Sequence, residues 1–340
     1  MNHCVDLSKF NLRTDLAIEL IGVENENIVT KKEKIDNIQI TSVDILKDGV
    51  ISKKKGKYIT IEFDDVTDFN NKEKVKEVFI GELKKLLKHM DIKDDFSCLA
   101  IGLGNVKSTP DSLGPDVIDN FVVTNHLFMV GDVGDGFRKT YSIKPGVTGE
   151  TGIETSELIK GIVKTIKPDF IIVIDALASQ SIDRVLKTIQ MTDTGIHPGS
   201  GVGNSRKEIS SDTLGIPVIA IGVPMVVDAV TIVSDTINYM YKHFSYTKEN
   251  INNPISKLIV GGVDYRKKDV NVKENEKSEL LGLVGNLSEK EIKQLIFEVL
   301  TPISFNLMVT PKETDFVLEK LVDIIGNGLN RALHKKISEI

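Results

Sequence analysis

The chain has 340 residues, of which 41% are hydrophobic and 27% are charged, and its formal net charge is -6. These proportions are typical of a globular protein with one large domain or two modest ones. The acidic balance argues against direct nucleic-acid binding and against a membrane-surface protein. We expect no secretory signal and no membrane span. With only Cys4 and Cys98 present, the sequence favours a reducing, cytoplasmic location.

The N-terminal part of the chain combines a polar leader with a set of predicted strands. Residues 1–15 are mostly polar and run into a short acidic and apolar stretch, Thr14 to Glu19. Apolar and polar residues then alternate through residues 28–72, with lysine-rich turns between them. Alternation of period two predicts antiparallel strands, so we expect residues 22–72 to form a peripheral β unit.

Continuous apolar segments alternate with amphipathic ones through the rest of the chain. Buried strands are predicted at 98–101, 170–174 and 218–224. Helices are predicted at 72–90, 111–128, 154–167, 183–190, 226–243 and 314–340, and a loop at 131–150. This order predicts an α/β fold with a mainly parallel sheet and helices on both faces. The more polar residues 244–300 are predicted to be an insertion at the sheet edge.

Two aspartates follow predicted core strands and are the candidate catalytic pair. Asp111 comes after the strand at 98–101, and Asp175 directly follows the strand at 170–174. Because loops at the carboxyl ends of parallel strands line the ligand crevice, the two side chains are expected to face one site. Two close carboxyls share one proton, so one serves as acid and the other as base in peptide hydrolysis. Each aspartate alone has the alternative role of a helix cap or turn residue.

A glycine-rich loop at residues 192–204 is the other candidate part of the site. Many glycines permit close approach of backbone amides to an extended peptide or an oxyanion. The alternative without a functional role is a long turn between a helix and a strand. Its Ser200 lacks the strand-turn-helix context of a nucleophile, and Asp193 is a reserve catalytic carboxylate. The candidate substrate-binding residues are Asp193, His197, Gly199, Ser200, Gly201, Gly203 and Asn204.

Metal and cofactor sites are weaker alternatives. Asp111, Asp175 and His197 would make a metal site of two carboxylates and one imidazole, but we favour a metal-free pair. The glycines at 102–104 lack the third glycine and the spacing of a dinucleotide-binding turn. The loop at 199–204 lacks the Lys-Ser/Thr pair of a phosphate loop. We therefore expect no cofactor.

The most distinctive parts of the chain are residues 14–19, 109–115, 152–156, 167–178, 192–204 and 214–224. These segments closely resemble the germination protease family of spore-forming bacteria. That family's fold is similar to that of hydrogenase-maturation endopeptidases, whose Gly-x-Gly-Asn strand end and strand-Asp-Ala ending recur here at 102–105 and 174–176. In those relatives the equivalent acidic positions can hold a metal.

The resemblance implies an endopeptidase that starts the degradation of small acid-soluble spore proteins during germination. It implies a homotetramer in the cytoplasm of the forespore or spore core, with Asp111 and Asp175 as catalytic residues. It also implies a zymogen that removes a short leader by self-cleavage. The family's substrates are cut after an acidic residue that follows Thr or Ser, before an apolar residue and Ala, with Glu beyond.

The segment from Thr14 to Glu19 has this substrate pattern. We therefore expect cleavage between Asp15 and Leu16, with residues 1–15 as propeptide and 16–340 as protease domain. Two other functions remain as alternatives: a metal-dependent maturation endopeptidase, and a non-catalytic nucleotide- or peptide-binding module. A self-cleavage site speaks against both, because neither needs one.

Overall fold

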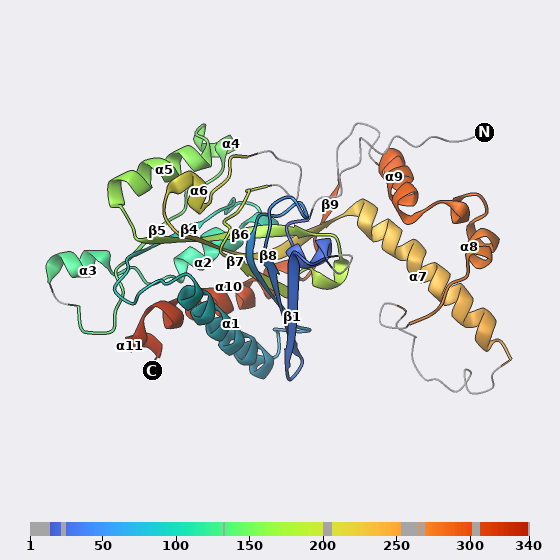
Figure 1. Ribbon diagram of the computed structural model, residues 1–340, viewed down its shortest axis with the longest axis horizontal. Helices are drawn as coiled ribbons and strands as arrows, with labels where there is room; N and C mark the ends of the chain where they lie inside the picture. The colour runs from blue at the N-terminus through green and yellow to red at the C-terminus, as the bar shows by residue number, and fades with distance from the viewer. Residues whose placement is uncertain are drawn as a thin grey trace. The chain divides into compact units, whose positions relative to one another are not determined.

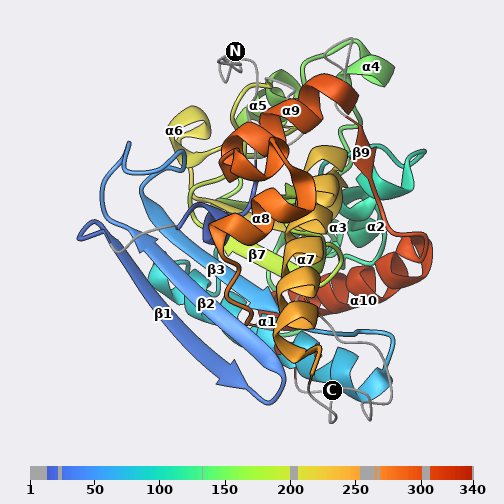
Figure 2. The same ribbon diagram turned by 90° about the vertical axis from the view of Figure 1, so that its right-hand side faces the viewer.

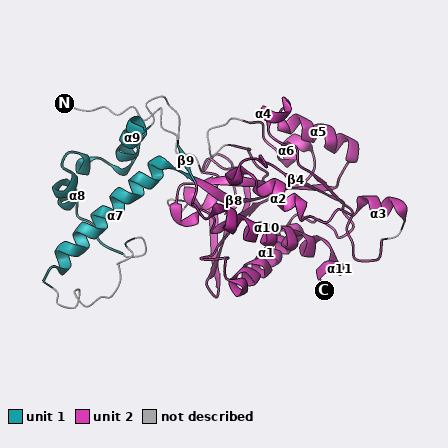
Figure 3. Cartoon of the chain, turned by 180° about the vertical axis from the view of Figure 1, so that it is seen from behind, with its two compact units in different colours: residues 1–12, 227–309 teal, residues 13–226, 310–340 magenta. Residues whose placement is uncertain are grey.

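The structure is a computed structural model that describes residues 14–21, 25–131, 133–199, 206–252, 265, 269–300 and 307–338. The chain folds into two compact units (Figure 3). The larger comprises residues 13–226 and 310–340, and the smaller comprises 1–12 and 227–309. Every candidate catalytic residue lies in the larger unit.

Within the described residues, the strands form one mixed sheet in the order β1-β2-β3-β7-β8-β6-β4-β5, and β9 pairs with the end of β8. Its core strands β4, β5 and β6 are parallel, whereas β1, β2, β3 and β7 pair antiparallel. The predicted α/β fold, with a parallel core and an antiparallel N-terminal part, is confirmed. The strands are β1 (Ile28–Ile35), β2 (Ile38–Ile45), β3 (Gly56–Glu62), β4 (Cys98–Gly102), β5 (Thr140–Ile143), β6 (Phe170–Ser179), β7 (Thr188–Thr192), β8 (Val218–Asp228) and β9 (Met308–Val309).

Helices cover both faces of the sheet in the larger unit, with α5 on one face and α1 and α10 on the other (Figure 1). The side chains of Ile159 and Val163 on α5 pack with Leu99, Ile101 and Ile171 of the strands. On the other face α1 packs along α10, which also contacts α2. The helices are α1 (Phe69–His89), α2 (Leu113–Asp119), α3 (Asn125–Val130), α4 (Thr148–Thr151), α5 (Thr155–Ile166), α6 (Ser211–Leu214), α10 (Thr314–Leu333) and α11 (Lys335–Ser338).

The smaller unit is a set of helices around α7. Val230 on α7 packs against Ile292 and Ile296 on α9. The helices of this unit are α7 (Ala229–Asn250), α8 (Glu274–Leu281) and α9 (Glu289–Leu300). No helix in the described parts of either unit has the length and apolar character needed to cross a bilayer.

The three N-terminal strands are joined to the main sheet rather than set apart from it. Figure 2 shows β1, β2 and β3 side by side, and Ile61 of β3 lies opposite Ile189 of β7. All seven residues of β3 are at least partly buried, whereas β1 exposes almost its whole length. This pairing places the loop before β3, which contains Lys53, next to the strands of the core.

Three of the predicted elements differ from the structure. The helix expected at 183–190 is wrong: a short 3-10 turn, η4 (Ile182–Arg184), is followed by strand β7. All five residues of β7 are buried between β3 and β8, so tertiary pairing overrides the local pattern. The loop expected at 131–150 contains β5, and the helix expected at 111–128 is divided into η3 (Thr109–Asp111), α2 and α3.

Candidate active site

Asp175 lies within a core strand of the sheet and is itself buried. A run of β-branched residues from Ile171 to Ile174 forms β6, and Asp175 continues that strand with only 5% of its surface exposed. Its Oδ1 accepts a hydrogen bond from the Ala176 amide at 2.9 Å. Burial raises the pKa of Asp175 well above its usual value, and the negative charges of Asp111 and Asp15 raise it further. This carboxyl therefore holds its proton more strongly than a surface aspartate does.

Asp111 is brought to the same place by a tight turn after β4. The Leu103 amide donates to the Ile174 carbonyl at 2.8 Å, and the Asn105 amide donates to the Asp111 carbonyl at 2.9 Å. Gly104 has a φ of +119°, and a Cβ there would lie 1.9 Å from the Asp111 carbonyl oxygen. Only glycine fits this turn without strain. The turn thus ties Asp111 to the strand that carries Asp175.

The two carboxyls have different environments. Burial raises the pKa of Asp111, but the positive charge of Arg206 and the hydrogen bond from Asn105 oppose this shift. Asp175 is more deeply buried and also feels the charge of Asp111. Because the environments push the two pKa values apart, the pair has one group suited to hold a proton and one suited to accept one.

The segment that contains the predicted cleavage site lies along β6 as an extra stretch of extended chain. The Asp15 amide donates to the Ala178 carbonyl at 3.1 Å, and the Ala178 amide donates to Asp15 Oδ2 at 2.9 Å. Leu16 and Ala17 are fully buried, and the 3-10 turn η2 (Ala17–Leu20) follows. The chain therefore holds its own Asp15–Leu16 bond three residues along the strand from Asp175.

Gln190 and Lys53 contact the peptide groups around this bond. Gln190 Nε2 donates to the Asp15 carbonyl at 2.9 Å, and its Oε1 accepts from the Ala17 amide at 2.7 Å. Lys53 Nζ donates to the same Asp15 carbonyl at 3.1 Å. One carbonyl oxygen thus receives two side-chain donors.

A second polar contact region holds Glu19, whose side chain is only 4% exposed. Its oxygens accept hydrogen bonds from Ser179 Oγ at 2.6 Å and from the Gln180 amide at 2.7 Å. Arg184 Nη1 lies 3.3 Å from Glu19 Oε1. Hydrogen bonds to an ionised carboxylate are stronger than those between neutral groups, so these contacts hold the Glu19 side chain in place.

The described part of the glycine-rich loop faces other partners. Asp193 Oδ1 accepts from the Lys57 amide at 2.8 Å, Asp193 Oδ2 lies 3.8 Å from His89 Nε2, and burial raises the pKa of Asp193. His197 is about half exposed, and its Nε2 lies 3.7 Å from Glu208 Oε2. Gly199 is the last described residue of the loop, and Ser200, Gly201, Gly203 and Asn204 lie outside the described residues.

Asp111, Asp175 and His197 are not gathered into one three-ligand site. Among the described residues, no group of three or more histidine, cysteine, aspartate or glutamate side chains is close enough to hold a metal ion. Cys98 is a buried free thiol whose pKa burial raises to about 12, so it stays protonated in the core.

Sequence reasoning missed four residues of this site: Lys53, Arg184, Gln190 and Arg206. Arg184 and Gln190 lie in the stretch expected to be helical. A sequence signal for the strand does exist, because Thr188 and Ile189 are both β-branched. Lys53 belongs to a lysine-rich turn that is indistinguishable by composition from a solvated one.

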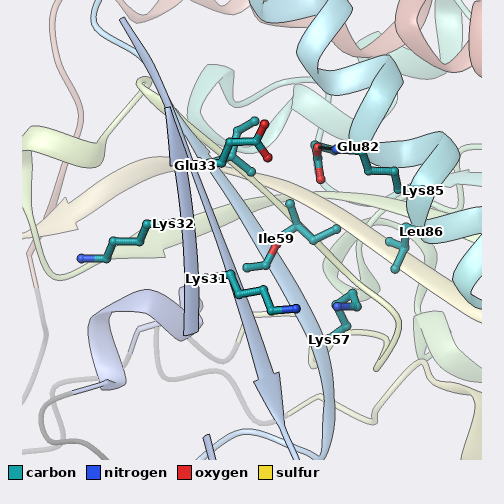
Figure 4. Close-up of a pocket in the computed structure, with 10 residues that line it drawn as sticks. Lys31, Lys32, Glu33, Lys57, Ile59, Glu82, Lys85 and Leu86 are labelled. Atoms are coloured by element: carbon teal, nitrogen blue, oxygen red, sulfur yellow. Dashed lines mark hydrogen bonds and ion pairs between the residues drawn. The ribbon is translucent and has the colours of Figure 1, made fainter. Parts of the chain in front are cut away.

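A separate hollow of about 600 Å³ lies between strands β1 to β3 and helix α1 (Figure 4). Lys31 and Lys57 border it from the strands, and Glu82 and Lys85 border it from α1, where their side chains form an ion pair of 2.7 Å. None of the candidate catalytic carboxyls lines this hollow, so it is distinct from the Asp111–Asp175 site.

A sequence model of the family described as germination protease matches residues 14–340 of the chain. The chain is 46% identical to the germination protease of Geobacillus sp. (strain WCH70), over 100% of this chain and 98% of that protein. It is 48% identical to the germination protease of Bacillus pumilus (strain SAFR-032) and 45% identical to that of Bacillus subtilis (strain 168), in each case over 98% of this chain and 96% of the relative. The fold and the matched family make the chain a peptidase. It belongs to the germination protease family.

Proposed function

We propose that the protein is the endopeptidase that begins the breakdown of small acid-soluble spore proteins, and that it is made as a zymogen that cleaves itself between Asp15 and Leu16. The observation that carries this proposal is the buried segment around that bond, which is hydrogen-bonded to β6 at Ala178, three residues along the strand from Asp175. In this proposal, an extended substrate would bind β6 in the same way. A homotetramer in the cytoplasm of the forespore or spore core is part of the proposal, and it rests on the family resemblance.

The two aspartates divide the proton transfers between them. Asp111 is the more easily ionised of the two. It accepts a proton from a water molecule while the oxygen of that water attacks the Asp15 carbonyl carbon. Asp175, which holds its proton, donates it to the Leu16 nitrogen as the carbon–nitrogen bond breaks. One water is consumed, and a carboxyl group and an amine are released. At a pH above the pKa of Asp175 both carboxyls are ionised, and no proton is available for the leaving nitrogen. The Asp15–Leu16 bond therefore stays uncut.

The test is the intact mass of the full chain, followed over time at several pH values with and without a chelator. Burial raises the pKa of Asp111, and it raises the pKa of Asp175 well above its usual value. We therefore expect the rate to rise as the pH falls through the pKa of Asp175, and to fall again once Asp111 is protonated. The expected product lacks residues 1–15. Cleavage that a chelator abolishes would support the metal-dependent alternative, and an unchanged mass at every pH would contradict self-processing.

The Glu19 contacts predict a preference of the enzyme for glutamate at the fourth substrate residue after the cleaved bond. For the self-processed protein acting on peptides of the pattern Thr-Asp-Leu-Ala-Ile-Glu, we expect Glu→Gln at the last position to lower kcat/KM by about 10-fold or more. The reason is that a charged hydrogen bond contributes roughly 1.5–3 kcal/mol. In Arg184→Ala the two peptides should differ much less. Arg331→Ala, which removes a cation whose partner is Glu77, is the control and should keep the preference. Equal discrimination in Arg184→Ala and the unsubstituted enzyme would remove Arg184 from this role.

A further inference from the structure

The carbonyl oxygen of the proposed scissile bond, that of Asp15, accepts hydrogen bonds from two side chains. Its two donors come from distant parts of the chain: Gln190 Nε2 at 2.9 Å, from strand β7, and Lys53 Nζ at 3.1 Å, from the loop before β3. Donors at roughly 2.7–3.1 Å are typical of sites that stabilise the negative oxygen of a tetrahedral intermediate. We propose that Lys53 and Gln190 form an oxyanion site that stabilises the developing charge on the Asp15 carbonyl oxygen. This inference rests on the proposed self-cleavage.

Gln190 is placed to fix the geometry of the bond as well as its charge. Its amide group donates to the carbonyl before Leu16 and accepts from the amide after Leu16. It is itself only 6% exposed and is held in a strand that is paired on both sides. The Gln190 side chain thus hydrogen-bonds to the backbone on both sides of Leu16, and these two bonds fix the orientation of the scissile peptide plane.

Lys53 supplies the positive charge. It is largely buried, which lowers its pKa, while the charges of Asp15 and Glu19 oppose that shift. The mildly acidic pH expected for the reaction favours the protonated form of an ammonium group. A cation in a site screened from water interacts more strongly with a developing oxyanion than the same cation in solvent does.

These groups supply a proton acceptor for the attack of water and a proton donor for the leaving nitrogen. When the water oxygen bonds to the Asp15 carbonyl carbon, the π electron pair moves onto the carbonyl oxygen, and the water proton passes to Asp111. Lys53 and Gln190 hold the resulting anion through hydrogen bonds, without transferring a proton. When the carbonyl re-forms, the carbon–nitrogen bond breaks and Asp175 protonates the Leu16 nitrogen.

The test is the first-order rate of leader removal from the full chain carrying Lys53→Met, measured by intact mass. We expect the rate to fall by about 100-fold or more, as is found when one oxyanion donor is removed. Lys53→Arg keeps a cation and donors and should lose less. Lys54→Met is the matched control, because the neighbouring Lys54 pairs instead with Glu208 at 2.5 Å and Asp212 at 2.7 Å. Its rate should be unchanged.

A second measurement separates charge stabilisation from docking. Hydrogen exchange of the Ala17 amide is measured in the uncut Asp175→Asn chain, with and without Lys53→Met. Protection that survives Lys53→Met, together with the lost rate, supports the oxyanion role. Loss of protection in parallel with rate would overturn it and leave Lys53 as a docking residue, and so would cleavage of Lys53→Met at the normal rate. If the unsubstituted chain does not cut itself at all, the proposed self-processing fails first, and this inference fails with it.

Discussion

Asp175→Asn is expected to abolish self-cleavage, with a fall in rate of about 10⁴-fold, as for other enzymes that lose one member of a catalytic unit. Asparagine has nearly the shape of a protonated aspartate but has no acidic proton to give to the leaving nitrogen. Asp111→Asn should have a similar effect, because it removes the group that accepts the water proton. The measurement is the intact mass of each full-length variant after incubation at mildly acidic pH.

Asp175→Asn should also stabilise the fold at neutral pH. The pKa of Asp175 is higher in the folded state than its usual value of 3.8, so between these two values the folded chain binds more protons than the unfolded chain. The free energy of unfolding of the unsubstituted protein therefore falls as the pH rises through this interval. Asp175→Asn lacks this penalty, so its advantage should grow above pH 3.8 and level off above the folded-state pKa.

Two comparisons make this prediction specific. Denaturant melts at a series of pH values should show Asp175→Asn and the unsubstituted chain converging at low pH and separating at neutral pH. Asp119→Asn changes an exposed carboxyl that pairs with Lys144 at 2.5 Å, and it should leave the processing rate unchanged. A cleavage-competent Asp175→Asn protein would contradict the catalytic assignment. An inactive variant without the pH-dependent gain would instead contradict the raised pKa.

Gly104→Ala is expected to displace Asp111 and to destabilise the fold by about 2–4 kcal/mol. The added methyl would lie 1.9 Å from the Asp111 carbonyl oxygen, at a φ of +119° that alanine rarely adopts. Overpacking against backbone and an unfavourable φ each cost roughly 1–3 kcal/mol. Because the clash is with Asp111, the proposed proton acceptor, the processing rate should fall more steeply than the loss of stability alone would explain.

Denaturant melts and intact-mass kinetics on the same preparation check this. Gly161→Ala is the control, because Gly161 lies on helix α5 with nothing within 4 Å of an added Cβ. That change should stabilise the helix by about 0.5–1 kcal/mol and leave processing as it is. Full processing in a folded Gly104→Ala chain would show that the turn can move without disturbing Asp111.

The accuracy of the sequence-based elements follows the strength of their periodicity. The helix expected at 72–90 matches α1, which begins three residues earlier and ends one residue earlier, because its apolar residues repeat at helical spacing and one stripe is buried. The strand expected at 170–174 lies within β6, but the structure extends it to Ser179, through Asp175 itself. The stretch at 183–190 carries no such clear period, and pairing with β3 and β8 made its end a strand.

The sequence alone determined the family resemblance, the α/β class, the two aspartates and the pattern around Asp15 and Leu16. These are local features: short motifs, periodicity and the residues that follow strands. Only the tertiary structure decided which distant groups meet the predicted scissile bond. Gln190 and Lys53 are 175 and 38 residues from Asp15 along the chain, and they reach it because β3 pairs with β7 and the cleavage-site segment lies against β6. Such contacts depend on which distant strands pair in the sheet, and tertiary packing rather than a local pattern decides that pairing.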